Sequence, residues 1–231
     1  FWLKPLRLEL PDSRGSLAPS GPALPSSAAA ALMPGSDLVR LSKSLTYFLR
    51  HGAVEHGLKM DAQGWVSVAD VLRLSCMRGV DVPQVKRMVL QCPKQRFEFS
   101  EPHARGKPAL IRATQGHSLP QVSDGMHRAV RSVADVGHDQ VVHGTYLTAW
   151  MKIRREGLST MGRNHVHLCT GLPGAGVISG MRSNAQVAIF VDLASMLSAG
   201  VEVLQSSNGV VLTNGDGRSG VLSTRHFKKA V

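Results

Sequence analysis

Side chains suited to binding phosphate occur together at two places in the first half of this sequence. The first place is Arg50 followed by His51, and the second is a turn at Gly116 that follows a predicted strand. The donors of the second place are Arg112, Gln115, His117 and Ser118. Arginine, glutamine, histidine and serine are good hydrogen-bond donors to phosphate oxygens. The alternative interpretations are a cationic helix cap at the first place and a solvated strand end at the second.

A second kind of chemistry, sugar binding, is indicated by His143, Gly144 and Thr145 at the end of another predicted strand. Glycine allows a ligand to approach the backbone closely, and the histidine and threonine side chains can bond sugar hydroxyls. A tripeptide of this kind also arises by chance, so it does not define a site by itself.

A histidine pair, His165 and His167, follows Arg163 in the sequence. Because side chains alternate along a strand, both imidazoles are expected on one face. Such a pair is also a common metal-ligand arrangement, but no obvious carboxylate or third ligand stands nearby, and the three cysteines form no Cys-x-x-Cys pair. We therefore expect ligand binding rather than a metal, and free thiols in a reducing compartment.

One more arginine, Arg182, lies between Gly180 and Ser183, just before the apolar segment 187–193. An arginine held where a loop meets a rigid strand is well placed to clamp a phosphate. The alternative is a surface salt bridge, and for one arginine taken alone that is the simpler interpretation.

Three helices and a hairpin are predicted to position the first group of residues. Apolar residues at three- and four-residue steps predict a helix capped by Ser36 and running to about Arg50. Two further helices are predicted, one capped by Ser67 and one opening at Pro83. Strands are predicted around 65–68, over 96–100 and over 109–115. This pattern is typical of a winged helix, a module that serves nucleic-acid binding or protein interaction.

The second half of the chain has a different residue pattern, which predicts short apolar strands separated by glycine-rich turns. Strands are predicted over 140–147, 165–169, 187–193 and 209–213, and helices over 148–157 and 192–200. We expect an α+β arrangement with a central sheet.

The composition favours an anionic partner. A formal net charge of +11 sets up a positive field that concentrates polyanions, so nucleic acid is the first partner to consider. A basic soluble protein without an anionic ligand is the alternative that composition leaves open. No apolar run approaches the roughly 18 residues of a membrane span, and we expect an intracellular protein of the cytoplasm or nucleus.

Residues 1–36 hold six of the chain's twelve prolines and are rich in alanine and serine. Such a segment cannot bury enough apolar area to offset the entropy of ordering, so a disordered leader is predicted. Its first ten residues are too interrupted by Lys4, Pro5 and Arg7 to form a secretory signal. The leader carries a formal charge of only +1, which assigns the basic surface to the rest of the chain.

The clusters, taken in order with the sequence that flanks them, resemble one family closely. The blocks LSKSLTYFLRHGAVEHGL, DAQGWV, IRATQGHS, VHGT, MGRNHVHL, VISGMRS, VAIFVD and SNGVVLT are similar to the successive signature blocks of the NAD-dependent tRNA 2′-phosphotransferases. The resemblance covers roughly residues 38–228. Agreement of several long blocks in one order is far more specific than any single tripeptide.

The resemblance implies an α+β fold made of two lobes. An N-terminal winged-helix lobe that binds RNA is expected over 37–120, after the leader at 1–36. An ADP-ribosyltransferase-like lobe with a central mixed β-sheet, which binds NAD⁺, is expected over 139–231. The polar segment 121–138 is expected to be a variable interlobe linker. A monomer is expected.

The reaction that the resemblance implies removes the splice-junction 2′-phosphate from ligated tRNA. A 2′-phosphate oxygen attacks the anomeric carbon of the nicotinamide ribose of NAD⁺, and nicotinamide leaves. The neighbouring 2″-hydroxyl then attacks phosphorus, giving RNA with a free 2′-hydroxyl and ADP-ribose 1″,2″-cyclic phosphate. NAD⁺ is therefore a co-substrate, and no metal is expected because fixed guanidinium groups can stabilise the phosphoryl charge.

The family's catalytic residues fall on four positions of this sequence. They are Arg50, His51, Arg112 and Arg182, with His51 expected to assist proton transfer in the second step. The expected NAD⁺-binding residues are His143, Gly144, Thr145, His167 and Val210. The expected RNA phosphate ligands are Gln115, His117, Ser118, Arg163 and His165.

Two other functions remain possible at this point. One is an ADP-ribosyltransferase that leaves ADP-ribose on a nucleic-acid terminal phosphate, and the other is a non-catalytic RNA-binding relative. The sequence departs from the family's usual residues at Thr114, Cys169 and Gln205. None of these departures removes one of the four expected catalytic residues.

Overall fold

The computed structural model describes residues 35–172, 181–182 and 184–231, which belong to one compact unit, Met33–Val231. The predicted leader, apart from its last two residues, lies outside the described residues. Gly180 and Ser183, two of the residues singled out beside Arg182, lie outside them as well.

The first helix, α1 (Gly35–Tyr47), runs directly into a π-helical turn, η1 (Phe48–Gly52). α1 starts one residue before the predicted cap, Ser36, a difference within the usual uncertainty of a helix boundary. Leu45 and Leu49 are fully buried, as the predicted apolar face requires. A π turn is rare and often marks a functional site, and this one carries Arg50 and His51.

Two further helices confirm the sequence prediction. α2 (Val68–Leu72) is capped by Ser67, whose hydroxyl accepts a hydrogen bond from the Asp70 N–H. α3 (Val82–Leu90) begins after Asp81, which forms a capping box with Gln84, and Pro83 lies in its first turn. A short 3₁₀ turn, η2 (Ser75–Met77), separates α2 from α3.

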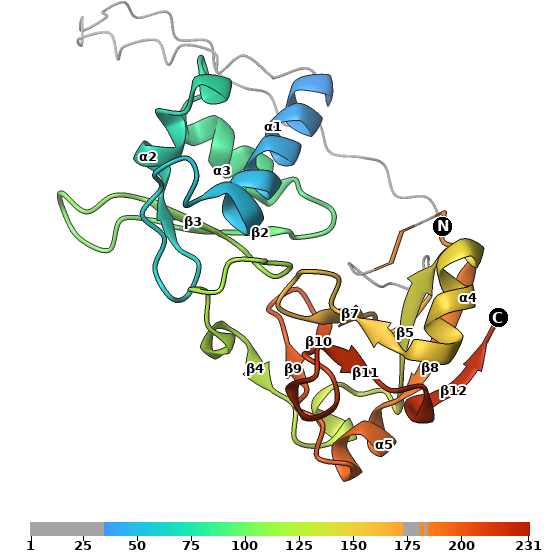
Figure 1. The fold of residues 1–231 in the computed structure, drawn as a ribbon. Coiled ribbons are helices and arrows are strands. Elements are labelled where there is room, and N and C mark those ends of the chain that lie inside the picture. The colour runs from blue at the N-terminus through green and yellow to red at the C-terminus, as the bar shows by residue number, and fades with distance from the viewer. Residues whose placement is uncertain (1–34, 173–180, 183) are drawn as a thin grey trace, which may run out of the picture. The chain divides into compact units, whose positions relative to one another are not determined.

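The predicted hairpin is also confirmed. β1 (Val66–Ser67), β2 (Phe97–Ser100) and β3 (Leu110–Ala113) form an antiparallel sheet of order β1-β3-β2. Its register sets Glu98 opposite Arg112. Figure 1 shows α1, α2 and α3 packed together beside β2 and β3. Leu45, Val85 and Ile111 are fully buried in the first hydrophobic core, which these elements enclose.

The second part of the chain contains three separate antiparallel sheets among its described residues. The first is β12-β8-β5, made of β5 (Gln140–Thr145), β8 (Val187–Asp192) and β12 (Phe227–Ala230). The second is β4-β9-β10-β7, made of β4 (Arg128–Ala129), β7 (Val166–Leu168), β9 (Leu204–Gln205) and β10 (Val211–Thr213). The third pairs β6 (Leu158–Ser159) with β11 (Val221–Leu222).

The prediction of one central mixed sheet was therefore wrong. Every ladder between these described strands is antiparallel, and only an isolated bridge from Val142 to Cys169 joins β5 to the strand that contains β7. Short apolar strands look alike in sequence whether their partners are parallel or antiparallel, so the pattern could not decide the direction of pairing.

Helices and short turns surround these sheets and close the second core. They are α4 (Leu147–Glu156), α5 (Leu193–Ser198), η4 (Val133–Asp135), η5 (Asp216–Arg218) and η6 (Thr224–His226). A further turn, η3 (Asp124–Met126), packs Met126 against the first core instead. Leu168, Ile189, Met196 and Leu222 are fully buried in this second core. No described helix is long and apolar enough to cross a membrane.

The segment 121–138, expected to be a linker, contributes ordered structure. Its strand β4 pairs with β9, and Val130 is buried in the second core. Val122 is buried in the first core. The segment thus connects the two cores and takes part in both.

Candidate active site

A cavity of about 710 Å³ collects most of the residues that the sequence singled out in the second half of the chain. Figure 1 shows β5 and β7, two of the strands that line it, beside α4. The predicted residues among its lining are His143, Gly144, Thr145, Arg163, His165, His167 and Arg182. Its size falls in the range of small-molecule sites, roughly 300–1,000 Å³.

The two strands hold their histidines in a fixed arrangement. His143 donates a hydrogen bond from Nδ1 to the backbone oxygen of His167, at 2.9 Å. This bond orients the His143 ring and leaves its Nε2 as an acceptor. Burial, the largest cause, lowers the pKa of His143, and the charge of Arg163 lowers it further.

His167, which also lines the cavity, has a ring nitrogen that forms no hydrogen bond with a described residue. Its Nε2 is buried and has no hydrogen-bond partner. Burial, followed by the charges of Arg163 and Arg50, lowers the pKa of His167 to about 3. The imidazole is therefore neutral at pH 7, and its Nε2 is available to a ligand.

Arg163 is the cation shared by the predicted clusters. Its positive charge lowers the pKa of Arg50, His51, His143 and His167. The segment that carries Arg163 also contacts the turn at Gly116, since the Asn164 N–H donates a hydrogen bond to the His117 carbonyl oxygen at 2.9 Å. Arg163 itself forms no ion pair with any other described residue.

Arg50 is held in the π turn with its guanidinium largely buried. Nε and Nη2 of Arg50 are buried and have no hydrogen-bond partner. Desolvation, then the charges of Arg163 and Arg96, lower its pKa to about 10, so it stays charged at pH 7. The guanidinium lies against Gly116, where a Cβ would come within 3.2 Å of Arg50 Cζ. A buried cation with open donors is suited to an anionic ligand.

His51 and Ser118, predicted from separate clusters, are in direct contact. His51 Nδ1 and Ser118 Oγ are 2.8 Å apart, and the Ser118 N–H donates to the Arg50 carbonyl oxygen at 3.0 Å. Burial, the charge of Arg163 and the charge of Arg50 lower the pKa of His51, in that order of size. The structure thus joins the turn at Gly116 to the π turn.

Arg112 is engaged elsewhere. Its Nη2 lies 2.6 Å from Glu98 Oε2, and its Nη1 donates to the Gln63 carbonyl oxygen. The guanidinium also stacks on Trp65, 4.5 Å from the ring centroid. Glu98 in turn accepts a hydrogen bond from the Ser207 hydroxyl. Glu98 and Trp65 were placed in predicted strands but were not selected as site residues, although the QRFE and GWV segments around them are distinctive.

Arg182 lies at the cavity with its side chain exposed. Its Nη1 donates to the Tyr146 hydroxyl at 3.2 Å, and this bond, the largest cause, lowers the pKa of Tyr146. Gly144 lies nearby, and a Cβ there would overlap Met181. The glycine is therefore required by the close approach of the chain that carries Arg182.

The remaining predicted RNA ligands are buried next to these residues. Gln115 and His117 are almost inaccessible, and His117 Nε2 has no hydrogen-bond partner. Burial, then the charge of Arg50, lowers the pKa of His117 to about 3. His165 Nε2 lies 2.8 Å from Asp124, a residue of the expected linker that the sequence analysis did not select.

Val210 does not take part in the cavity. It is fully buried in a small cluster with Leu204 and Leu212. Its backbone N–H donates to the Ser206 hydroxyl, which fixes the turn before β10. Val210 therefore presents no exposed surface to a ligand in this structure.

No group of three or more histidine, cysteine or acidic residues within the described ranges is arranged to hold a metal ion. Cys76, Cys92 and Cys169 are free thiols.

Comparison with known proteins identifies the family. Residues 36–215 match the family model for "RNA 2′-phosphotransferase, Tpt1 / KptA family". The chain belongs to this family. It is 43% identical over 193 residues to tRNA 2′-phosphotransferase 1 of Danio rerio, covering 83% of this chain and 84% of that one. It is 42% identical to the Homo sapiens protein of the same name over 197 residues, covering 84% and 75%.

More distant members are also similar. The tRNA 2′-phosphotransferase of Saccharomyces cerevisiae is 37% identical over 183 residues, covering 76% of this chain and 78% of the yeast protein. The family match spans the first hydrophobic core, the second core except for its last residues around Leu222, and every residue of the cavity named above.

Proposed function

We propose that this chain removes the splice-junction 2′-phosphate from ligated tRNA by transferring it to NAD⁺. The products are RNA with a 2′-hydroxyl, nicotinamide and ADP-ribose 1″,2″-cyclic phosphate. Family membership supports the phosphotransfer, since the relatives are named tRNA 2′-phosphotransferases. The observation that carries the proposal is the guanidinium of Arg50, whose buried Nε and Nη2 have no hydrogen-bond partner among the described residues, beside a cavity that holds Arg163 and Arg182.

The cavity suits a dinucleotide in size and in chemistry. Arg163, Arg182 and Lys152 line it and offer positive charge to a diphosphate. His143 Nε2 and His167 Nε2 are acceptors without a described partner, which fits ribose hydroxyls or an amide. Bound NAD⁺ would supply an activated ribose carbon with a good leaving group.

The chain's own residues would act mainly by holding charge in place. Arg50 would bind the RNA 2′-phosphate through Nε and Nη2, the two atoms that have no partner. Arg182, which precedes β8 in the chain, would contact the phosphate after releasing the Tyr146 hydroxyl. A phosphate is already nucleophilic at neutral pH, so this step needs orientation rather than a base.

His51 would act as the proton acceptor in the second step. Its neutral imidazole, favoured by the lowered pKa, would accept the proton of the attacking ribose hydroxyl. Ser118 would keep the ring oriented through the 2.8 Å contact at Nδ1. This contact leaves Nε2 to take the proton.

Arg112 would join the site only by exchanging partners. Its guanidinium is neutralised by Glu98 in the structure described here, and an RNA phosphate would have to compete with that carboxylate. The exchange is consistent with a contact made late, when charge builds on phosphorus.

We also propose that the two hydrophobic cores correspond to a winged-helix lobe over 37–120 and an ADP-ribosyltransferase-like lobe over 139–231. The three helices followed by the β2–β3 hairpin support the first assignment. The antiparallel β5–β8–β12 sheet, with its cavity at the end of β5, supports the second.

The decisive experiment incubates the full chain with a short RNA bearing one internal 2′-phosphate, with and without NAD⁺. We expect loss of the 2′-phosphate only with NAD⁺, with equimolar nicotinamide and ADP-ribose cyclic phosphate. An RNA that keeps ADP-ribose on a terminal phosphate would instead indicate ADP-ribosyltransfer. Binding of the RNA without any change in either substrate would indicate a non-catalytic relative.

A further inference from the structure

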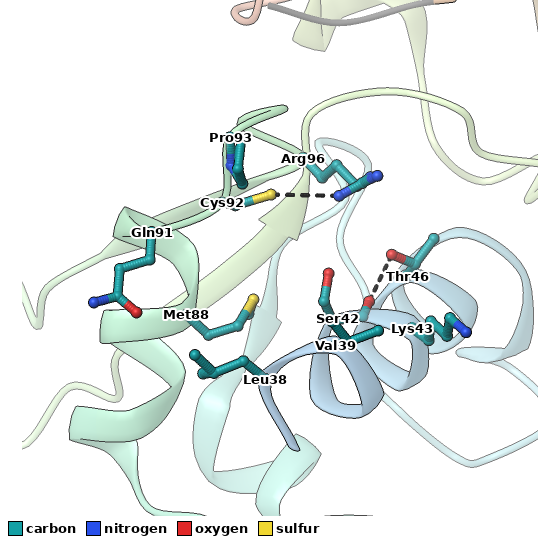
Figure 2. A pocket seen from close by; sticks show the side chains of 10 residues that line it. All are labelled: Leu38, Val39, Ser42, Lys43, Thr46, Met88, Gln91, Cys92, Pro93 and Arg96. Carbon is teal, nitrogen blue, oxygen red and sulfur yellow. Dashed lines mark hydrogen bonds between the residues drawn. The ribbon is translucent and has the colours of Figure 1, made fainter. Parts of the chain in front are cut away.

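A second hollow, separate from the candidate active site, lies between α1 and the turn that follows α3. Figure 2 shows its side chains from close by. Its volume is about 600 Å³. The lining residues are Leu38, Val39, Ser42, Lys43, Thr46, Met88, Gln91, Cys92, Pro93 and Arg96. We call this hollow the α1–α3 groove.

The groove combines an apolar floor with a cationic rim. Leu38, Val39 and Met88 supply apolar surface, and Val39 is 55% exposed. Lys43 and Arg96 supply positive charge, and neither forms an ion pair with another described residue. In Figure 2 the Arg96 guanidinium contacts Cys92 Sγ, at 3.6 Å. The described residues that line the groove include no acidic side chain.

The groove and Arg50 share one helical stretch and one neighbouring cation, Arg96. Arg96 lines the groove, and its charge is one of the causes that lower the pKa of Arg50. Ser42 and Thr46, which line the groove on α1, precede Arg50 at four-residue steps along one helical stretch. Side chains at such steps follow one another on the same side of a helix. A ligand held at Arg50 therefore has the groove directly beside it.

We propose that the α1–α3 groove binds one nucleotide of the RNA strand, adjacent to the nucleotide that carries the 2′-phosphate. The base lies on Leu38 and Val39, above the buried Met88, and its phosphodiester is bonded by Lys43 and Arg96. This inference rests on the proposed function, which sets a phosphorylated nucleotide at Arg50. The cationic rim formed by Lys43 and Arg96 favours a polyanion over an apolar peptide, and no described lining residue is a carboxylate that would attract a basic partner.

The groove is tested by binding, without NAD⁺, so that turnover plays no part. Two hexanucleotides with an internal 2′-phosphate are compared; one is intact, and one lacks the bases on both sides of the modified nucleotide. The unmodified chain should bind the intact RNA about fivefold or more tightly, because the bound base removes apolar side-chain surface from water. Equal affinity for the two RNAs would overturn the proposal.

Two matched pairs of variants locate the effect. Val39→Glu should abolish the preference for the intact RNA, whereas Val231→Glu, at an equally exposed valine outside the groove, should preserve it. Lys43→Glu should reduce the slope of log affinity against log salt by about one, and Lys229→Glu should not. Preserved preference in Val39→Glu, or equal slopes in the two lysine variants, would exclude the groove.

The same variants separate the other occupants and the proposed function. If Val39→Glu lowers the melting temperature of the RNA-free chain and leaves RNA binding unchanged, the groove holds protein, and the proposal is wrong. If the base preference holds but NAD⁺ gives no nicotinamide release, the proposed function fails and the groove remains an RNA site. If turnover is normal but the chain binds the two RNAs equally tightly, the proposed function is supported and the groove is excluded as an RNA site.

Discussion

At the scale of single residues, the candidate site is defined by cations that lack counterions. Arg50 is buried with two unbonded nitrogens, and Arg163 and Arg96 lie close enough to depress its pKa. Such an arrangement is unfavourable in the free protein, because desolvation and like-charge repulsion both act against it. A ligand phosphate would relieve both costs at once.

This reasoning predicts opposite effects of Arg50→Gln on activity and stability. We expect kcat/KM to fall by about 100-fold or more, since a donor aimed at the phosphate is lost. We expect stability to hold or rise by about 1 kcal/mol, roughly 2–4 °C in Tm for a chain of this size. Turnover assays and thermal unfolding measure the two effects, with the exposed Arg154→Gln as control. A large loss of stability would contradict the description of Arg50 as an unpaired buried cation.

The pH dependence of His51 supplies a second prediction. Its pKa is lowered by burial, by Arg163 and by Arg50, so the imidazole stays neutral until the pH falls below 6.5. If neutral His51 is the proton acceptor, the acid limb of the kcat profile lies below pH 6.5. Arg163→Gln removes one of the depressing charges and should move this limb to higher pH. An unmoved limb in Arg163→Gln, measured beside Arg154→Gln, would rule out this role for His51.

At the scale of elements, the turn at Gly116 and the π turn at Arg50 form one unit. Gly116 has a φ of +88° and lies against the Arg50 guanidinium. Ser118 bonds the π turn at both its side chain and its backbone. The position of Arg50 therefore depends on the turn as much as on α1.

Replacing Gly116 tests this dependence, and the chain offers a close control. Gly106 has a φ of +84°, but no atom lies within 4 Å of a Cβ built there. Both Gly116→Ala and Gly106→Ala should cost about 1–2 kcal/mol from the left-handed backbone alone. Only Gly116→Ala should also lower kcat/KM, by about tenfold or more, because it displaces Arg50. Similar kcat/KM values in the two variants would show that Gly116 does not position Arg50.

At the scale of the whole molecule, buried neutral histidines make stability depend on acidity. The pKa values of His117 and His167 are lowered to about 3, and that of His127 to about 4, mainly by burial. These histidines connect the two cores, since His117 belongs to the first part of the chain and its carbonyl oxygen accepts from the Asn164 N–H. Charging them would disturb the region between the cores.

Acid unfolding is therefore expected at moderately low pH. A lowered pKa in the folded state means that the unfolded chain takes up protons first as the pH falls through about 6.5. Stability is fully present above that pH and declines toward pH 3–4, by about 1.4 kcal/mol per pH unit for each such histidine. His117→Gln should make the decline in Tm between pH 6.5 and 4.5 shallower, whereas the exposed His103→Gln should not. Equal declines would contradict the burial of a neutral His117.

The sequence by itself determined the elements and the order of the polar clusters. The helix cap at Ser67, the apolar face of α1 and the longer strands depend on local patterns, so they could be predicted residue by residue, whereas the Asp81 cap and the strands β4, β6, β9, β11 and β12 were not predicted. The family resemblance likewise depends on short blocks that can be read directly from the sequence.

Only the tertiary structure decided which clusters meet. Contact between His51 and Ser118, and the shared influence of Arg163, join segments far apart in the chain, and no local pattern encodes such distances. The same holds for the pairing of Arg112 with Glu98, for the burial of Val210 and for the antiparallel direction of the sheets. These features depend on long-range packing, because packing decides which residues from distant parts of the chain become neighbours of each side chain.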